Sequence, residues 1–298
     1  MSSIPKKPTI LSILSVLCCS LSLTLAASPC SPSESLETLV KHGRINEPSI
    51  DESSGLVRSR RWANLFWTHN DSGGNARIFA IRGDGTSLKN PSSDHSGVAV
   101  TGAKNIDWED IALDDENFLI IGDIGNNISY RPELTLYRVR EPDPFKHGST
   151  EQAERVFVYF PESPSLAFNC EALFWAGGTV YLMTKTRGGN NTGLYRVQSK
   201  GPEGKAPLFR VGSFDFEAPV TAADASADGR LLAVLTYKAV WLFERPGETD
   251  NYLRGKRAYS PFRFSSCEAI CFDGDRLLIG NERGDLFELD AEALHPLK

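Results

Sequence analysis

Short apolar runs alternate with polar turns along most of this chain, and the runs are shorter than ordinary helices. Five of the runs begin beside an acidic residue: Glu52, Glu109, Glu171, Asp224 and Glu268. Each run ends in a tight turn, such as 177–178 (Gly-Gly) or 228–229 (Asp-Gly). Tight turns between short apolar runs are typical of β-hairpins. The pattern therefore predicts repeated antiparallel strands.

Each repeat continues with further strands. A second apolar strand ends in a polar cluster, as in 65–74 (LFWTHNDSGG) and 118–127 (FLIIGDIGNN), and a third strand alternates apolar and polar positions. Weaker outer strands follow at 97–102, 155–161, 208–214 and 256–264. The fifth repeat ends near Asp290 without an outer strand. Residues 39–45 (LVKHGRI) are the segment that can supply it.

The repeat length predicts the fold. The spacing of the five acids lies in the range of four-stranded blades that are arranged around a common axis. We therefore expect an all-β fold, a five-bladed β-propeller of four-stranded antiparallel blades that is closed by the N-terminal strand. Six blades are the alternative, if the insertion between Glu133 and Glu162 contains another blade.

The N-terminal segment has the composition of a secretory signal. Lys6 and Lys7 precede an apolar run over 10–25, and small residues follow at 26–27. We therefore predict a signal peptide over 1–27, a linker over 28–36 and the propeller domain over 37–298. The expected location is secreted or periplasmic. No other apolar stretch is long enough to span a membrane.

The charge of the chain excludes one class of partner. Without the two signal lysines, the formal net charge of −6 becomes −8. Nucleic acid requires a basic surface, so we expect no nucleic-acid partner. Cys30, Cys170, Cys267 and Cys271 remain after the signal. Cys267 and Cys271 share one predicted strand at a spacing too long for a disulfide, so we expect mainly buried thiols.

Propeller geometry predicts where the acids meet. The loops that enter the innermost strands and the loops after the second strands open on the same face. The candidate metal ligands on that face are Glu52, Glu109, Asp123, Glu171, Asp224 and Glu268. Oxygen ligands of this kind suit Ca²⁺ or Mg²⁺. A cationic ligand is one alternative, and acids that only accept backbone hydrogen bonds between blades are the other.

Polar residues around the acids supply candidate chemistry. We expect His69 to act as a base or ligand, and Lys185 and Arg131 to stabilise negative charge. The candidate substrate-binding residues are Asn70, Asp71, Asn126, Asn127, Tyr237 and Glu282. The segment 68–73 (THNDSG) is too compact for a Ser-His-Asp triad. The loop 122–127 (GDIGNN) precedes a strand rather than a helix, which argues against a phosphate loop.

The order of the motifs resembles a known group of proteins. LFWTHNDSGG, IDWEDIAL, GDIGNN and CEALFW are similar to the serial motifs of uncharacterised secreted bacterial β-propeller proteins, and the match covers about 46–290. More distantly, the layout resembles esterase-like phytases and gluconolactonase-type propellers. That resemblance implies a metal held by acidic and amide side chains on one face. The Lys- and Arg-rich subsites that phytate would need are sparse here.

Two functions of different classes follow. In the first, a divalent ion on the axial acids assists hydrolysis of an ester, lactone or phosphoester. In the second, the acidic centre belongs to a non-catalytic binding protein of the cell envelope. In both cases we expect a monomer with a small-molecule or cation ligand at the rim of the propeller.

Overall fold

The structure is a computed structural model that describes residues 39–89, 96–128, 130–186, 191–201, 203–264 and 266–296. All of these residues belong to one compact unit. The predicted signal peptide over 1–27 and linker over 28–36 lie outside the described residues, as does Cys30. No described helix is long and apolar enough to cross a membrane.

The described residues form β-strands, two short 3₁₀ helices and no α-helix. The elements are β1 (Val40–Arg44), β2 (Ser53–Arg58), β3 (Phe66–Asn70), β4 (Arg77–Ile81), β5 (Ser87–Leu88), β6 (Val98–Ala99), β7 (Trp108–Leu113), β8 (Phe118–Asp123), β9 (Leu134–Arg140), β10 (Glu154–Tyr159), β11 (Cys170–Ala176), β12 (Thr179–Thr184), β13 (Thr192–Val197), β14 (Ala206–Phe214), β15 (Val220–Ala225), β16 (Leu231–Thr236), β17 (Ala239–Glu244), η1 (Tyr252–Arg254), β18 (Arg257–Pro261), β19 (Cys267–Asp273), β20 (Arg276–Asn281), β21 (Asp285–Asp290), η2 (Ala291–Ala293) and β22 (His295–Pro296).

Hydrogen bonding joins these strands into four sheets. One sheet has the order β11-β12-β13-β14-β10-β9-β8-β7, in which a short parallel pairing of β10 with β14 joins two antiparallel halves. The sheet β15-β16-β17-β18 gains β22 at its outer edge. The N-terminal strand β1 pairs antiparallel with β21, next to β20 and β19. The first and last parts of the domain therefore share one sheet.

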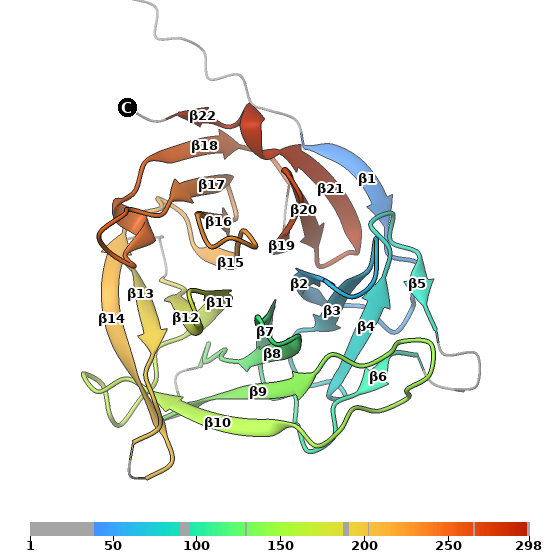
Figure 1. The fold of residues 1–298 in the computed structure, drawn as a ribbon, viewed down its shortest axis with the longest axis horizontal. Helices are drawn as coiled ribbons and strands as arrows, with labels where there is room; N and C mark the ends of the chain where they lie inside the picture. The colour runs from blue at the N-terminus through green and yellow to red at the C-terminus, as the bar shows by residue number, and fades with distance from the viewer. Residues whose placement is uncertain are drawn as a thin grey trace, which may run out of the picture. The chain divides into compact units, whose positions relative to one another are not determined.

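The sheets are arranged around a central axis, as in a β-propeller (Figure 1). Strands β2, β7, β11, β15 and β19 lie nearest the centre. Each packs against the next, and β19 packs against β2, so the inner strands form a closed cycle. A radial arrangement of this kind leaves only short, protected sheet edges at the centre.

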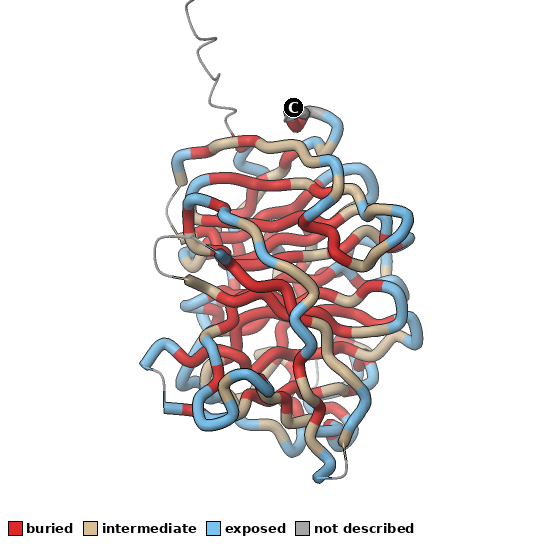
Figure 2. Tube along the Cα trace, turned by 90° about the vertical axis from the view of Figure 1, so that its left-hand side faces the viewer, coloured by how far each residue is buried: buried red, intermediate tan, exposed pale blue. Residues whose placement is uncertain are grey.

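The hydrophobic core is divided among the spaces between neighbouring sheets. Trp67 of β3 and Trp108 of β7 are fully buried in one such cluster. Phe174 of β11 and Phe243 of β17 are buried in another. Figure 2 shows strands that are buried over most of their length and loops that are exposed. The alternating strands therefore bury apolar faces between sheets, as the sequence pattern predicts.

Cys170, Cys267 and Cys271 are free and buried, which confirms the prediction of core thiols for the described cysteines.

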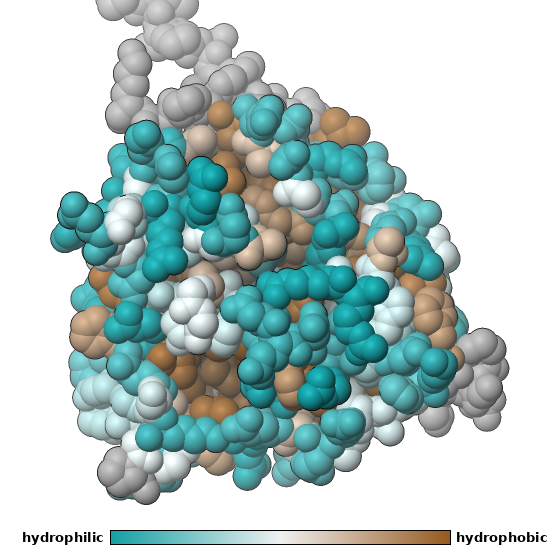
Figure 3. Space-filling view, viewed as in Figure 1, coloured by the Kyte–Doolittle hydropathy of each residue, from teal (hydrophilic) through white to brown (hydrophobic). Residues whose placement is uncertain are grey.

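The outer surface differs from the core in composition. The face in Figure 3 is mainly hydrophilic, and hydrophobic residues appear chiefly inside hollows.

Candidate functional site

Every inner strand has a β-bulge close to its start. The antiparallel pairing with the second strand skips one residue in each case. The skipped residues are Gly55, Glu109, Glu171, Thr221 and Glu268. A bulge redirects a side chain out of the regular alternation of the strand. The structure thus gives three of the five predicted acids equivalent positions.

The other two predicted acids are not bulge residues, which corrects the sequence alignment. Glu52 is exposed and precedes Gly55 by three residues, but it stays beside the site, because its carbonyl accepts the Asp71 N–H at 2.9 Å and its charge helps to raise the pKa of Asp71. Asp224 follows Thr221 by three residues and lies near the far end of β15. It lines a small cavity with Arg58 and Arg60, at the turns that end the inner strands. In these two repeats the sequence pattern makes Glu52 and Asp224 equivalent to the bulge acids because of their residue type. The bulges show that Gly55 and Thr221 occupy the equivalent positions.

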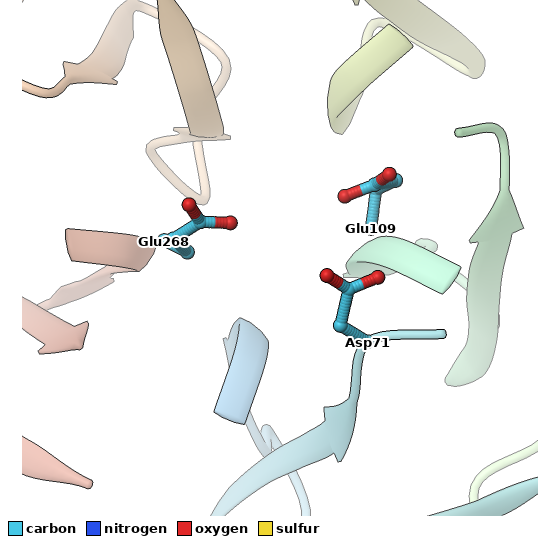
Figure 4. Close-up of side chains that lie close together, drawn as sticks. All are labelled: Asp71, Glu109 and Glu268. Carbon is cyan, nitrogen blue, oxygen red and sulfur yellow. The ribbon is translucent and has the colours of Figure 1, made fainter. Parts of the chain in front are cut away.

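The axial cluster is formed by Asp71, Glu109 and Glu268. One carboxylate oxygen from each lies within 4.8 Å of the others. Glu109 and Glu268 are the bulge residues of β7 and β19, whereas Asp71 belongs to the loop after β3. Figure 4 shows the three carboxylates directed toward a common space.

Burial leaves part of this cluster without hydrogen-bond partners. Glu109 is 1% exposed, and its Oε1 atom has no N–H or hydroxyl donor among the described residues, while its carboxyl lies within hydrogen-bond reach of the Glu171 carboxyl. The Oδ1 atom of Asp71 is also buried without a partner in the described part of the chain. A buried carboxylate oxygen without a partner is costly, so each such atom calls for a proton or a cation.

The pKa values of all three cluster acids are raised, as expected for carboxylates that are buried close to one another. Burial, followed by Asp107 and Glu171, raises the pKa of Asp71 to about 7. Burial raises the pKa of Glu268 to about 7, although Tyr237 and Lys185 favour its charged form. The pKa of Glu109 is raised well above its usual range by burial and by Glu171 and Asp71. Like charges in one confined space disfavour ionisation in this way.

A lysine and a tyrosine connect the remaining glutamate to the cluster. Lys185 Nζ lies 2.9 Å from Glu171 Oε2 and donates a hydrogen bond to the Tyr237 hydroxyl at 3.1 Å. Tyr237 in turn donates to Glu268 Oε1 at 2.6 Å. Burial works against the charged form of Lys185, but Glu171 and Glu268 raise its pKa, so its ammonium stays charged. Lys185 and Tyr237 therefore lie at the predicted site.

Gly125 covers the other side of Glu109. A Cβ atom at this position would overlap the carboxylates of Glu109 and Asp107. Asp107 is half-buried, and burial and Glu171 raise its pKa. The glycine of the GDIGNN motif is thus required by close approach of carboxylates rather than by a phosphate.

Asp123 and Arg131 form a buried ion pair with each other. Arg131 donates to Asp123 Oδ1 at 2.8 Å and to the Gly125 carbonyl at 2.9 Å. Burial raises the pKa of Asp123, and Arg131 opposes that shift. The structure therefore places the predicted metal ligand and the predicted anion-binding residue in contact, where they hold the 123–131 loop.

His69 lies inside the sheet rather than on its rim. The residue is 0% exposed, its ring packs edge-on against Trp108 at 5.6 Å, and its Nδ1 atom lies 3.0 Å from the Asn70 carbonyl. Burial lowers the pKa of His69 to about 4. The imidazole is therefore neutral at pH 7.

The other predicted binding residues differ in their surroundings. Asn70 donates to the Ser49 carbonyl and to Asp51, and the side chain of Asn126 bonds only backbone groups of its own and a neighbouring loop. Asn127 is exposed beside a cavity, and Glu282 is half-buried close enough to Glu268 to raise its pKa. Asn127 therefore lies at the cavity, and Glu282 lies near the cluster acid Glu268.

A cavity of about 620 Å³ lies next to the partners of Glu171, and none of the three cluster acids is among its described lining residues. Its lining includes Lys185 and Asn169, which both contact Glu171, at 2.9 and 3.0 Å. Phe168 and Tyr195 form an aromatic part of the wall. A volume of this size is in the range of small-molecule sites.

Sequence reasoning missed the roles of two acids. Asp71 was predicted to bind substrate, but it belongs to the carboxylate cluster. Asp110, one residue after Glu109, is 0% exposed and accepts backbone hydrogen bonds from β11 and β15. The only signal for Asp110 was a second acid in IDWEDIAL, inside a predicted strand.

Comparison with known proteins gives likeness in fold only. No family model matches the chain. No curated protein matches its sequence. Solved structures with a similar backbone include the PQQ-bound aldose sugar dehydrogenase from Streptomyces coelicolor (12% identity, 85% of this chain and 97% of that chain, TM-score 0.48). Two further structures have a similar backbone. One is hydrazine synthase from Kuenenia stuttgartiensis (10% identity, 80% of this chain and 71% of that chain, TM-score 0.44). The other is the WD40 β-propeller domain of Doa1 (13% identity, 88% of this chain and 71% of that chain, TM-score 0.39).

Proposed function

We propose that this protein binds a divalent cation, Ca²⁺ or Mg²⁺, through Asp71, Glu109 and Glu268 and hydrolyses an ester, lactone or phosphoester in the adjoining cavity. The observation that carries the proposal is a buried set of converging carboxylates with unpartnered oxygens. With the predicted export signal, the protein would act in the periplasm or outside the cell.

The donor atoms fit such an ion. Oxygen ligands lie about 2.3–2.6 Å from Ca²⁺, so ligands of one ion are separated by at most about 5 Å. The three carboxylates, within 4.8 Å of one another, meet this limit for Ca²⁺. Mg²⁺, with ligands at about 2.0–2.1 Å, would require them to move closer together. They are all oxygen donors, which favours Ca²⁺ or Mg²⁺ over softer metals. Glu171 already has Lys185 and Asn169 as partners, so we place it beside the ion rather than among its ligands.

The surrounding residues have separate roles in this proposal. A bound ion would supply a Lewis acid that polarises the reacting carbonyl or phosphoryl group. Tyr237 holds Glu268 in position through the 2.6 Å hydrogen bond. Lys185 presents its charge at the cavity wall, where negative charge develops as water attacks. We assign no catalytic role to His69 or Arg131, because the His69 ring packs against Trp108 inside the sheet and Arg131 is held by Asp123 and the Gly125 carbonyl.

The blade number is part of the proposal. We take each inner strand as the start of one blade, which gives five blades. The eight-stranded sheet then counts as two blades joined by the β10–β14 bridge. On this interpretation the insertion between Glu133 and Glu162 contributes an outer strand, β10, rather than a sixth blade.

Calorimetric titration of the purified chain with CaCl₂ and MgCl₂ tests the cation site. Glu109→Gln and Glu268→Gln should each weaken binding at least tenfold, because each removes a charged ligand. Asp224→Asn is the matched control, since this acid lies near the far end of β15, and should leave the affinity unchanged. Equal affinity in all four proteins would refute the site.

Hydrolysis is tested separately with 4-nitrophenyl acetate, a γ-lactone and 4-nitrophenyl phosphate, each with and without EDTA. We expect at least one rate that EDTA abolishes and the cation restores. Tight cation binding without turnover of any substrate would favour the non-catalytic binding protein.

A further inference from the structure

An apolar surface borders the cavity. It lies beside the 161–169 loop and strands β12, β13 and β14. Phe168 and Leu166 line the cavity and are 39% and 36% exposed. Behind them, Phe160 packs against Phe168 at 4.7 Å and against Tyr195 at 4.8 Å. Large apolar side chains that remain exposed beside a cavity mark a surface for an apolar ligand group.

A second loop extends this surface. Ile128 and Tyr130 are also exposed, and they belong to the loop that carries Asn126 and Asn127 of the cavity wall. The two loops are tied together, because Ala167 N donates to the Arg131 carbonyl at 2.7 Å and Asn126 Nδ2 donates to the Ala167 carbonyl at 2.7 Å. The exposed apolar residues are therefore held by a fixed framework of hydrogen bonds.

Two of the four asparagines that line the cavity, Asn126 and Asn169, already have partners in the protein. Asn126 bonds the backbone of residues 130, 131 and 167. Asn169 accepts from Asn126 N and donates to Asn127 Oδ1 and Glu171 Oε1. These asparagines therefore shape the wall and offer little to the hydroxyl groups of a polyol.

The charged groups of the wall argue against a polyanion. Among the described residues that line the cavity, Lys185 and Arg210 are basic and Glu162 is acidic. Lys185 is bonded to Glu171 and Tyr237. A ligand with several phosphates would need more free positive charge than this.

We infer that the cavity binds the acyl chain of a medium-chain carboxylic ester or lactone, with the carbonyl at Lys185 and the chain against Leu166, Phe168 and Tyr195. The inference rests on the proposed function, because it names the substrate class of that site. Lys185, which contacts Glu171, and the partly exposed Leu166 and Phe168 all line this cavity.

A chain-length series tests the substrate class in the intact protein with CaCl₂. The kcat/KM for 4-nitrophenyl octanoate should exceed that for the acetate at least tenfold. Phe168→Ser should reduce this ratio at least fivefold. Phe145→Ser is the matched control, because Phe145 is also exposed and does not line the cavity. The ratio should not change in that variant.

Binding of octanoate, measured by calorimetry in the presence of EDTA, separates the subsite from catalysis. Octanoate binding that Phe168→Ser weakens supports the subsite even if no ester is hydrolysed, in which case only the proposed hydrolysis fails. Ester hydrolysis without chain-length preference and without octanoate binding overturns the subsite. Binding of phosphatidylcholine vesicles that Phe168→Ser abolishes and octanoate does not inhibit also overturns it, because the apolar loops would then contact a membrane.

Discussion

The carboxylate of Asp110 accepts the backbone N–H of Leu173 at 2.9 Å, which links β7 to β11 at the centre of the ring. The same Oδ2 atom accepts the N–H of Ala223 of β15 at 3.2 Å, and Oδ1 accepts the N–H of Ile111 at 2.9 Å. One buried side chain thus joins three inner strands, one residue after Glu109.

Asp110→Ala should strongly destabilise the protein, because it leaves three buried N–H groups without an acceptor. Each unsatisfied group costs about 1–3 kcal/mol, so we expect a loss of several kcal/mol in the free energy of unfolding. Urea denaturation measures the loss. Asp115→Ala on the exposed turn is the control and should change stability by less than about 1 kcal/mol. A similarly small change for Asp110→Ala would contradict the assigned role.

Gly125→Ala should weaken cation binding, because the added methyl group would displace the carboxylates of Glu109 and Asp107. We expect at least a tenfold rise in the Kd for Ca²⁺ by calorimetry. Gly74→Ala is the matched control, since a Cβ there has nothing within 4 Å. Identical affinities for the two variants would show that Gly125 does not set the position of the cluster.

Tyr237→Phe should reduce cation affinity about tenfold, because a hydrogen bond to a charged group contributes about 1.5–3 kcal/mol. The variant removes the donor that holds Glu268 and one partner of Lys185. Calorimetry gives the affinity, and the thermal midpoint of the cation-free protein reports on the fold. An unchanged affinity would mean that Glu268 keeps its position without Tyr237.

Asp224 should make stability depend on pH. Burial raises the pKa of Asp224 to about 7 in the folded protein, while Oδ2 accepts the Phe272 N–H at 2.9 Å. Because the folded pKa lies above the unfolded value, the folded state is favoured by protonation. This contribution is complete below about pH 4 and is lost as pH rises through about 7.

Asp224→Asn keeps an acceptor oxygen and removes the titration. Urea denaturation from pH 4 to pH 8 should therefore show the variant gaining stability relative to the wild type as pH rises. A constant difference over this range would indicate that the carboxyl of Asp224 titrates near its ordinary pKa.

The sequence by itself determined the strand pattern, because alternating apolar residues and turn residues are local signals. It also located Glu109, Glu171 and Glu268 at equivalent positions, and residues 39–45 as an outer strand. The structure pairs that strand, β1, with β21. The strand pattern depends on neighbours in the chain, whereas the pairing of β1 with β21 joins segments far apart in the sequence.

Only the tertiary structure decided which acids meet. The bulges at Gly55 and Thr221 change the register by amounts that residue type does not reveal. Asp224 therefore lies away from the cluster, whereas Glu52 is exposed beside it and accepts the Asp71 N–H at 2.9 Å through its carbonyl. Asp71 joins the cluster because the loop after β3 brings it beside Glu109, 38 residues further along the chain. Long-range packing sets such distances, and no local periodicity records them.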